Sequence, residues 1–90
     1  MRETVRVLIT GAAGFIGAHL AGLLRERGEI GGRRIGALAL ADQTLADTAG
    51  EIAIRGDLAD LGVMAKIATF RPDVVFHLAA VPGGASEQDY

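Results

Sequence analysis

Three glycines at regular spacing near the start of the chain could do chemistry together. Gly11, Gly14 and Gly17 follow an apolar run at residues 5–9 that only Arg6 interrupts. The first glycine would permit a tight bend, the second would let the main chain approach a diphosphate, and the third would let a helix cross closely over a strand. The helix after them would offer unpaired N–H groups and the positive end of its dipole. The spacing therefore predicts a phosphate-binding turn.

A carboxylate follows the next predicted strand. Asp42 lies 25 residues after Gly17, and the long EIGGRR stretch explains the surplus over the usual spacing of about 20 residues. At this point Asp42 would accept hydrogen bonds from the hydroxyls of an adenosine ribose. The alternative is an aspartate that caps a turn at a strand end. A Walker A loop is excluded, because it needs Lys and then Ser or Thr where Ala18 and His19 stand.

The segment TGAAGFIG at 10–17 resembles the fingerprint of the extended short-chain dehydrogenase/reductase family, which includes the nucleotide-sugar epimerases and dehydratases. The resemblance implies an α/β fold, the doubly wound parallel sheet of an NAD(P)-binding Rossmann domain. It also implies a Tyr-x-x-x-Lys active site, which this sequence lacks. The only tyrosine is Tyr90, the last residue, and the only lysine is Lys66, in a predicted helix, so we expect no catalytic residue here.

The resemblance also assigns residues to the cofactor and the substrate. In this family, a turn such as Gly-Asp-Leu at 56–58 contacts the adenine. The strand end HLAA at 77–80 lies beside the ribose on the nicotinamide side, and the segment after it borders the substrate. From the residues alone, the aspartate of that turn could equally cap the turn itself. The implied cofactor residues are Gly11, Ala13, Gly14, Phe15, Ile16, Gly17, Asp42, Asp57, Leu58, Leu78, Ala79 and Ala80. The implied substrate residues are Pro82, Gly83, Gly84 and Ser86.

The charge of Asp42 favours NAD over NADP as the cofactor. A hydrogen bond to a charged group contributes about 1.5–3 kcal/mol, whereas opposing like charges cost several kcal/mol. A 2′-phosphate against this carboxylate would therefore be disfavoured by about a hundredfold or more.

The elements that must position these residues can be read along the chain. Apolar runs predict strands and amphipathic patterns predict helices, with strands at 5–9, 35–41, 51–55 and 73–78 and helices at 15–27 and 61–70. Gly28 ends the first helix, Asp60 is the expected N-cap of the second, and Arg71-Pro72 ends it. The stretch EIGGRR at 29–34 is expected to be a polar loop at the end of the sheet opposite the nucleotide.

Helical spacing also predicts which side chains face the core. On the first helix these are Ile16, Leu20, Leu23 and Leu24, and on the second they are Leu61, Met64, Ala65, Ile67 and Ala68. Arg33 and Arg34 are expected to be solvated and not to clamp a 2′-phosphate. His19 is expected to be solvated, and His77 to have a core or supporting role.

The composition excludes several other classes of protein. A net charge of −2 with interspersed charges provides no basic field for nucleic acid and no polybasic segment for a membrane. The absence of cysteine excludes disulfides and thiolate chemistry, and we expect no metal site. No apolar run approaches the ~20 residues of a membrane span, and the first strand begins too early for a signal peptide. We therefore expect a cytoplasmic protein.

The length suggests part of a larger domain. Ninety residues provide about four strands and two to three helices, whereas a doubly wound domain has about six strands. We therefore expect the N-terminal portion of a Rossmann domain, incomplete and without its substrate domain, from an enzyme that forms a homodimer. An incomplete parallel sheet exposes an apolar edge, so the isolated chain is expected to be marginally stable or to aggregate.

Three functions remain open from the sequence. The stretches GGRRI, LALAD and HLAAVPGGASEQDY resemble the D-erythronate dehydrogenase branch of the family, which favours an oxidoreductase that passes hydride between NAD and a hydroxylated sugar acid. A nucleotide-sugar epimerase or dehydratase would need the same fingerprint. A non-catalytic dinucleotide sensor would bind NAD through the same turn.

Overall fold

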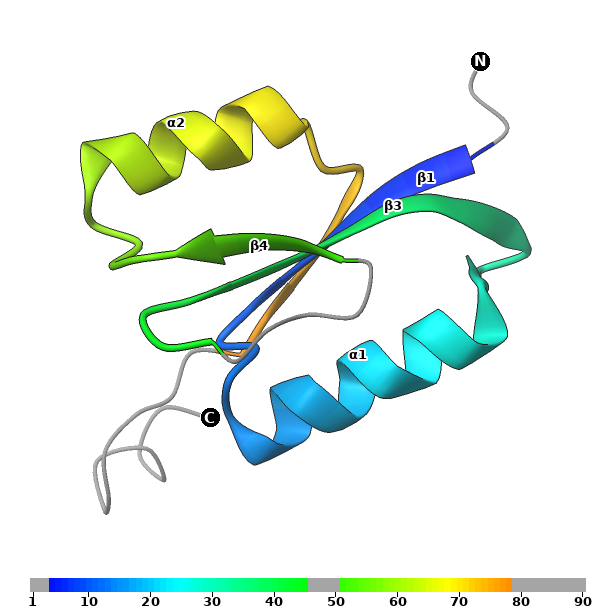
Figure 1. Cartoon of the computed structure of the whole chain (residues 1–90). Coiled ribbons are helices and arrows are strands. Elements are labelled where there is room, and N and C mark those ends of the chain that lie inside the picture. The colour runs from blue at the N-terminus through cyan, green and yellow to red at the C-terminus, as the bar shows by residue number, and fades with distance from the viewer. Residues whose placement is uncertain (1–3, 46–50, 79–90) are drawn as a thin grey trace, which may run out of the picture.

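The computed structural model describes residues 4–45 and 51–78, which form a mostly parallel sheet with one helix on each face (Figure 1). In chain order the elements are β1 (Thr4–Thr10), α1 (Phe15–Arg27), β2 (Glu29–Ile30), β3 (Arg33–Asp42), β4 (Ile52–Arg55), α2 (Leu61–Phe70) and β5 (Val74–His77). Both helices have the bounds that the sequence predicts. Among these residues, no helix has the length and apolar character needed to cross a membrane.

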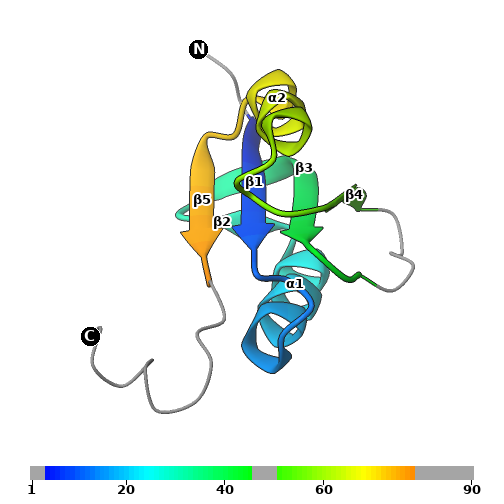
Figure 2. The same ribbon diagram turned by 90° about the vertical axis from the view of Figure 1, so that its left-hand side faces the viewer.

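The order of the parallel strands is that of a Rossmann half. β1 pairs in parallel with β3 on one side and with β5 on the other, and β4 pairs in parallel with the carboxyl half of β3. The parallel strands therefore run β4-β3-β1-β5, as Figure 2 shows. This is the 3-2-1-4 order with which the doubly wound dinucleotide-binding sheet begins. The predicted fold class is confirmed.

The stretch at 29–34 forms a β-hairpin and not the loop that we expected. β2 pairs antiparallel with the first residues of β3, across a two-residue turn at Gly31 and Gly32. Both glycines have positive φ, +57° and +79°, as a type I′ hairpin turn requires. The signal was present in the sequence, because Gly-Gly between two extended segments is a hairpin pattern. The hairpin extends β3 at its amino end, so that the strand covers Arg33–Asp42 where we predicted 35–41.

Alternate residues of β1 build two separate cores. Val5, Val7 and Ile9 face α1 and are almost completely buried. Leu8 faces the other way, into a cluster that includes Val63 and Phe70 of α2. Figure 1 shows the two helices on opposite sides of the sheet. Burial on both faces explains why the predicted strand reads as a nearly continuous apolar run.

The buried face of α1 differs in part from the predicted one. Leu20 and Leu24 pack against the sheet as expected, but the other buried positions are Gly17 and Ala21, and Ile16 is 68% exposed. Leu23 is exposed as well. The first turn of the helix lies so close to the glycine turn that a Cβ at Gly17 would come within 2.5 Å of the Gly11 oxygen, and the small Ala21 follows among the buried positions.

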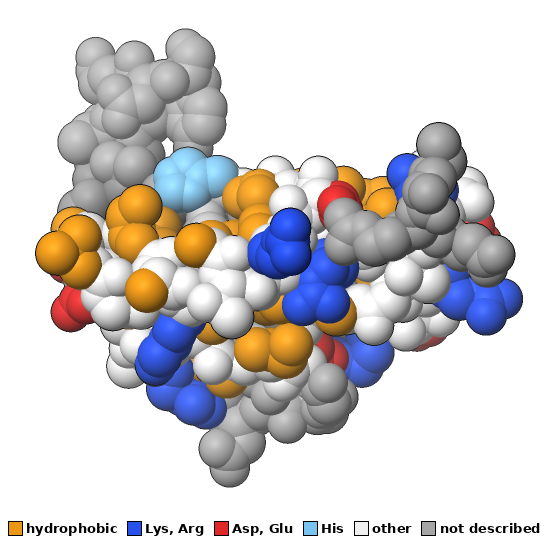
Figure 3. All heavy atoms as spheres, turned by 90° about the horizontal axis from the view of Figure 1, so that it is seen from above, with side chains coloured by type: hydrophobic (Ala, Val, Ile, Leu, Met, Phe, Trp, Pro, Cys, Tyr) orange, Lys and Arg blue, Asp and Glu red, His pale blue; other side chains and the backbone are white. Residues whose placement is uncertain are grey.

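The prediction for α2 was wrong for most of its stripe. The helix buries Val63 and Phe70, with Ile67 partly buried between them, whereas Leu61 is 84% exposed and Met64, Ala65 and Ala68 are also exposed. Lys66 is the only charged residue in α2, so the sequence of this helix does not indicate a clear polar face. Figure 3 shows hydrophobic side chains on the upper surface, the side of the sheet that carries α2.

An ion pair links α1 to the segment before β4. Arg25, in the last turn of α1, donates from Nε to the Glu51 carboxylate. The Glu51 side chain is only 3% exposed. The hydrogen bond to Glu51 raises the pKa of Arg25 above its ordinary value, and burial opposes the rise. This pair joins the helix to the strand beyond β3.

Arg6 has a structural role that the sequence did not reveal. Its Nε donates to the Phe70 carbonyl at 2.5 Å, and its guanidinium carbon lies 4.5 Å from the centre of the Phe70 ring. The backbone of Arg6 is also bonded to Asp73, through N–H to Oδ2 at 2.8 Å and from the Asp73 N–H at 2.7 Å. The charged residue in the apolar strand therefore holds the C-terminal end of α2 over the sheet.

We predict that Arg6→Met lowers the free energy of unfolding by about 1–2 kcal/mol. The variant keeps an apolar stem but loses one hydrogen bond at a helix end and one cation–π contact. Urea unfolding followed by circular dichroism measures the change. Arg27→Met, which alters an exposed arginine at the end of α1, is the control and should change stability by less than about 0.5 kcal/mol. Equal losses in both variants would contradict the role of Arg6.

Candidate functional site

The glycine turn leaves the carboxyl end of β1 and is bonded to the end of β3. Gly11 has φ +73°, which provides the predicted tight bend. The N–H groups of Gly11 and Ala12 both donate to the Ala41 carbonyl, at 2.9 and 3.2 Å. The Gly14 N–H returns to the Gly11 carbonyl at 3.2 Å, and α1 begins at the next residue. The turn is therefore shaped by the neighbouring strand as well as by its own residues.

Gly14 and Gly17 have different reasons to be glycine. A Cβ at Gly17 would lie 2.5 Å from the Gly11 oxygen and 2.7 Å from the Ala12 Cα, so the protein's own backbone excludes it. A Cβ at Gly14 would meet only the Gly11 oxygen, at an ordinary 3.5 Å, and the φ of −71° suits any residue. The fold therefore requires glycine at 17 and leaves the space beside 14 open.

Two backbone N–H groups hold the Asp42 carboxylate. Oδ2 accepts from Ala13 in the glycine turn at 2.9 Å, and Oδ1 accepts from Gln43 at 2.6 Å. The sequence left open whether this aspartate caps a turn or faces a ligand. It does cap main-chain groups, but an ionised carboxylate has about four acceptor positions, so two bonds do not exhaust it. Asp42 is only partly buried and can accept further hydrogen bonds.

A hollow of about 350 Å³ brings this carboxylate together with residues from two other segments. Four of its lining residues were predicted as cofactor residues: Gly11, Asp42, Asp57 and Leu58. The others are Ala41, Gln43, Thr44 and Gly56. Sequence reasoning missed Gln43 and Thr44, although their position directly after a strand-end aspartate could have indicated them, because carboxyl ends of parallel strands meet at one edge.

The turn after β4 shapes the second wall of the hollow. Gly56 has φ +143°, and its N–H donates to the Asp42 carbonyl at 2.9 Å. Asp57 Oδ1 accepts from the Ala59 N–H at 2.9 Å, so this aspartate caps its own turn while it lines the hollow. Asp60 Oδ1 accepts from the Gly62 N–H at 2.6 Å, which confirms it as the N-cap of α2.

The remaining predicted residues of the turn lie open at the surface. Ala13 and Gly14 are exposed, Phe15 is 87% exposed, and Ile16 lies beside it at the start of α1. The Phe15 ring stacks on His19 with 6.5 Å between ring centres, and His19 is exposed, as expected. These residues do not line the hollow. They belong to the glycine turn or follow it directly in the sequence.

A second link joins the ends of β1 and β5. The hydroxyl of buried Thr10 lies 2.6 Å from His77 Nδ1, and the Leu78 N–H donates to the Thr10 carbonyl at 2.9 Å. His77 is exposed, so the core role was wrong and the supporting role is the one that the structure favours. The predicted residues Ala79, Ala80, Pro82, Gly83, Gly84 and Ser86 lie outside the described residues.

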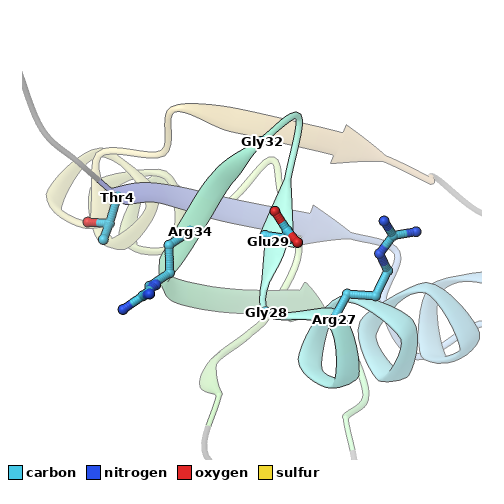
Figure 4. Close-up of a pocket in the computed structure, with 6 residues that line it drawn as sticks. All are labelled: Thr4, Arg27, Gly28, Glu29, Gly32 and Arg34. Carbon is cyan, nitrogen blue, oxygen red and sulfur yellow. The ribbon is translucent and has the colours of Figure 1, made fainter.

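A larger hollow, of about 540 Å³, lies at the opposite end of the sheet. Thr4, Arg34 and the hairpin turn border it together with the end of α1 (Figure 4). In that view the guanidinium groups of Arg27 and Arg34 point in different directions, away from a common centre. The smaller hollow is the better candidate, because it combines the glycine turn with a main-chain-held carboxylate at the carboxyl edge. In the described parts of the chain, no three His, Asp or Glu side chains are grouped to hold a metal ion.

The chain is similar to known dehydrogenases and to a known epimerase. D-erythronate dehydrogenase from Cupriavidus necator is 37% identical over 96% of this chain, and UDP-glucuronate 4-epimerase 2 from Arabidopsis thaliana is 36% identical over 91%. The NAD complex of a variant uronate dehydrogenase from Agrobacterium tumefaciens superposes on 88% of the chain with a TM-score of 0.68 and 28% identity.

The chain spans less than a third of each of these relatives: 29% of the dehydrogenase, 21% of the epimerase and 28% of the uronate dehydrogenase. Residues 7–90 match the family described as NAD dependent epimerase/dehydratase family. The glycine turn, the strand order and this match lead to one conclusion: the chain belongs to the NAD-dependent epimerase/dehydratase family.

Proposed function

We propose that this chain binds NAD across the carboxyl edge of its sheet and forms the cofactor-binding, N-terminal portion of a Rossmann domain. The observation that carries the proposal is the Asp42 carboxylate, held by the Ala13 and Gln43 N–H groups in one hollow with Gly11 and Asp57. In this proposal the parent protein transfers hydride between NAD and a hydroxylated sugar acid.

The geometry of Asp42 suits a vicinal diol. Each carboxylate oxygen already accepts one backbone N–H, which leaves about one further acceptor position on each oxygen. Two neighbouring ribose hydroxyls can donate to these positions without displacing the backbone. A 2′-phosphate would instead bring a second negative charge to the same place.

The start of α1 suits the diphosphate. Its first helical hydrogen bond runs from the Ala18 N–H to the Gly14 carbonyl, so the N–H groups of residues 15–17 have no partner within the helix. They lie at the positive end of the helix dipole, next to the open space beside Gly14. At the other end, Asp57 and Leu58 would meet the adenine, by the family resemblance.

The substrate remains a proposal at the level of its class. The similarity to D-erythronate dehydrogenase and uronate dehydrogenase supports a sugar acid. The similarity to UDP-glucuronate 4-epimerase supports a nucleotide sugar as the alternative. Residues 1–90 contain no Tyr-x-x-x-Lys pair, so the proposal assigns them cofactor binding and no catalytic role. Neither nucleic acid nor a membrane is a proposed partner, and the proposed parent is a cytoplasmic homodimer.

The two enzyme classes differ in what they release. If the proposed parent protein is a dehydrogenase, it should release free NADH when it is given NAD and D-erythronate. The ultraviolet absorbance of NADH measures this product. UDP-glucuronate under the same conditions should give no net NADH. Epimerised sugar without free NADH would favour the alternative, and NAD binding without turnover of either compound would favour a dinucleotide sensor.

We predict that NAD binds at least about a hundredfold more tightly than NADP. The reason is repulsion between the 2′-phosphate and Asp42, which is worth several kcal/mol. Isothermal titration of the two dinucleotides, at one ionic strength, gives the ratio. Equal affinities would contradict the proposed place of the ribose.

We predict that Gly14→Ala lowers only the affinity for NAD, whereas Gly17→Ala lowers both affinity and stability. Gly14→Ala should keep its melting temperature but lose at least about tenfold in NAD affinity, because the new methyl group lies where the diphosphate approaches. Gly17→Ala should lose stability as well as affinity, because its methyl group meets backbone at 2.5 Å.

Gly22→Ala is the matched control. A Cβ at Gly22 has nothing within 4 Å, so this variant should bind NAD normally and gain about 0.5–1 kcal/mol from helix propensity. If Gly14→Ala bound NAD as tightly as the control, the diphosphate would not lie at this turn.

A further inference from the structure

The glycine turn is hydrogen-bonded to two consecutive residues of β3, Ala41 and Asp42. Three successive N–H groups of the turn, those of residues 11–13, donate to the Ala41 carbonyl and to Asp42 Oδ2. We propose that Asp42 is a positioning residue for the diphosphate-binding turn, in addition to its proposed contact with the ribose. This inference rests on the proposed function of the same site.

The bond from Ala13 is the one in this set that involves a charged group. The bonds from Ala12 to Ala41 and from Gly14 to Gly11 are both long, at 3.2 Å, and link neutral groups. The bond from Ala13 to Asp42 is 2.9 Å and charge-assisted, a type roughly twice as strong as its neutral counterpart. The Ala13 residue itself is exposed and has no packed side chain that could replace this bond.

Asp42 is held in place by further hydrogen bonds of its own. Asp42 Oδ1 accepts from the Gln43 N–H at 2.6 Å, and the Asp42 carbonyl accepts from the Gly56 N–H at 2.9 Å. Side chain and main chain of Asp42 are therefore both tied to their surroundings before any ligand arrives. An asparagine has a single acceptor oxygen and cannot accept from both Ala13 and Gln43 through separate oxygens.

The two roles of Asp42 predict opposite signs for a ligand without ribose hydroxyls. If Asp42 only contacts the ribose, Asp42→Asn removes a negative charge near an anion, so a diphosphate without those hydroxyls should bind equally well or more tightly. If Asp42 also positions the turn, the same substitution should weaken that ligand. We use ADP and 2′,3′-dideoxy-ADP as the two probes.

We expect Asp42→Asn to bind 2′,3′-dideoxy-ADP about tenfold more weakly than the wild-type chain, and to lose still more affinity for ADP. Asp60→Asn is the matched control, since it removes the same charge nearby but keeps the N-cap of α2, for which asparagine is equally suitable. It should bind both probes as the wild-type chain does. Unchanged or tighter binding of the dideoxy probe by Asp42→Asn would overturn the inference.

A measurement without ligand separates this inference from the proposed function. In the free protein, hydrogen exchange of the Ala13 amide should speed up at least tenfold in Asp42→Asn, while amides in the middle of β1 and β3 keep their rates. Unchanged exchange at Ala13 would overturn the positioning role even if NAD binds. Faster exchange in a chain that binds neither probe would retain the positioning role and reject the proposed function.

Discussion

The pairing of β1 with β3 is the constraint on which the rest of the site depends. In this parallel ladder Thr10 is the partner of Ala41, so the residues that follow them, Gly11 and Asp42, lie side by side at the carboxyl edge of the sheet. The turn can then donate to the Ala41 carbonyl and to the Asp42 carboxylate. A shift of one residue in this register would turn the alternating side chains of β3 to the opposite faces and separate the carboxylate from the turn.

Close packing of α1 follows from the same arrangement. Because the turn is pulled toward β3, the first turn of the helix passes directly over the Gly11 carbonyl, where only Gly17 can fit. Along the helix the buried positions are first the small residues Gly17 and Ala21 and then the larger Leu24. Its free N–H groups remain at the edge where the carboxylate and the hollow lie.

The two ends of the sheet carry different chemistry. At the carboxyl ends, Gly11, Asp42 and the turn at 56–58 line one hollow. At the amino ends, Arg6 holds the end of α2, and the guanidinium groups of Arg34 and Arg27 point in different directions. The hairpin that lengthens β3 is confined to this second end, so it does not alter the site. Charge is therefore arranged by the fold in a way that the balanced composition does not reveal.

The sequence by itself determined the two helices and the four parallel strands, and it indicated the edge of the sheet where the candidate site lies. Helix ends were predictable because they depend on local chemistry, such as the αL glycine at 28 and the N-cap aspartate at 60. The glycine spacing and the strand-end Asp42 indicated the edge of the sheet that carries the hollow, since the carboxyl ends of parallel strands meet there.

Only the tertiary structure decided which face of each helix is buried, why Arg6 stands in an apolar strand, and that Asp42 is bonded to Ala13. α2 is apolar on more than one side, so its orientation depends on what it packs against and not on its own pattern. The bond between Asp42 and Ala13 joins residues 29 positions apart, and it exists because strand register brings their backbones together. Such contacts depend on distances between elements, which spacing along a chain does not contain.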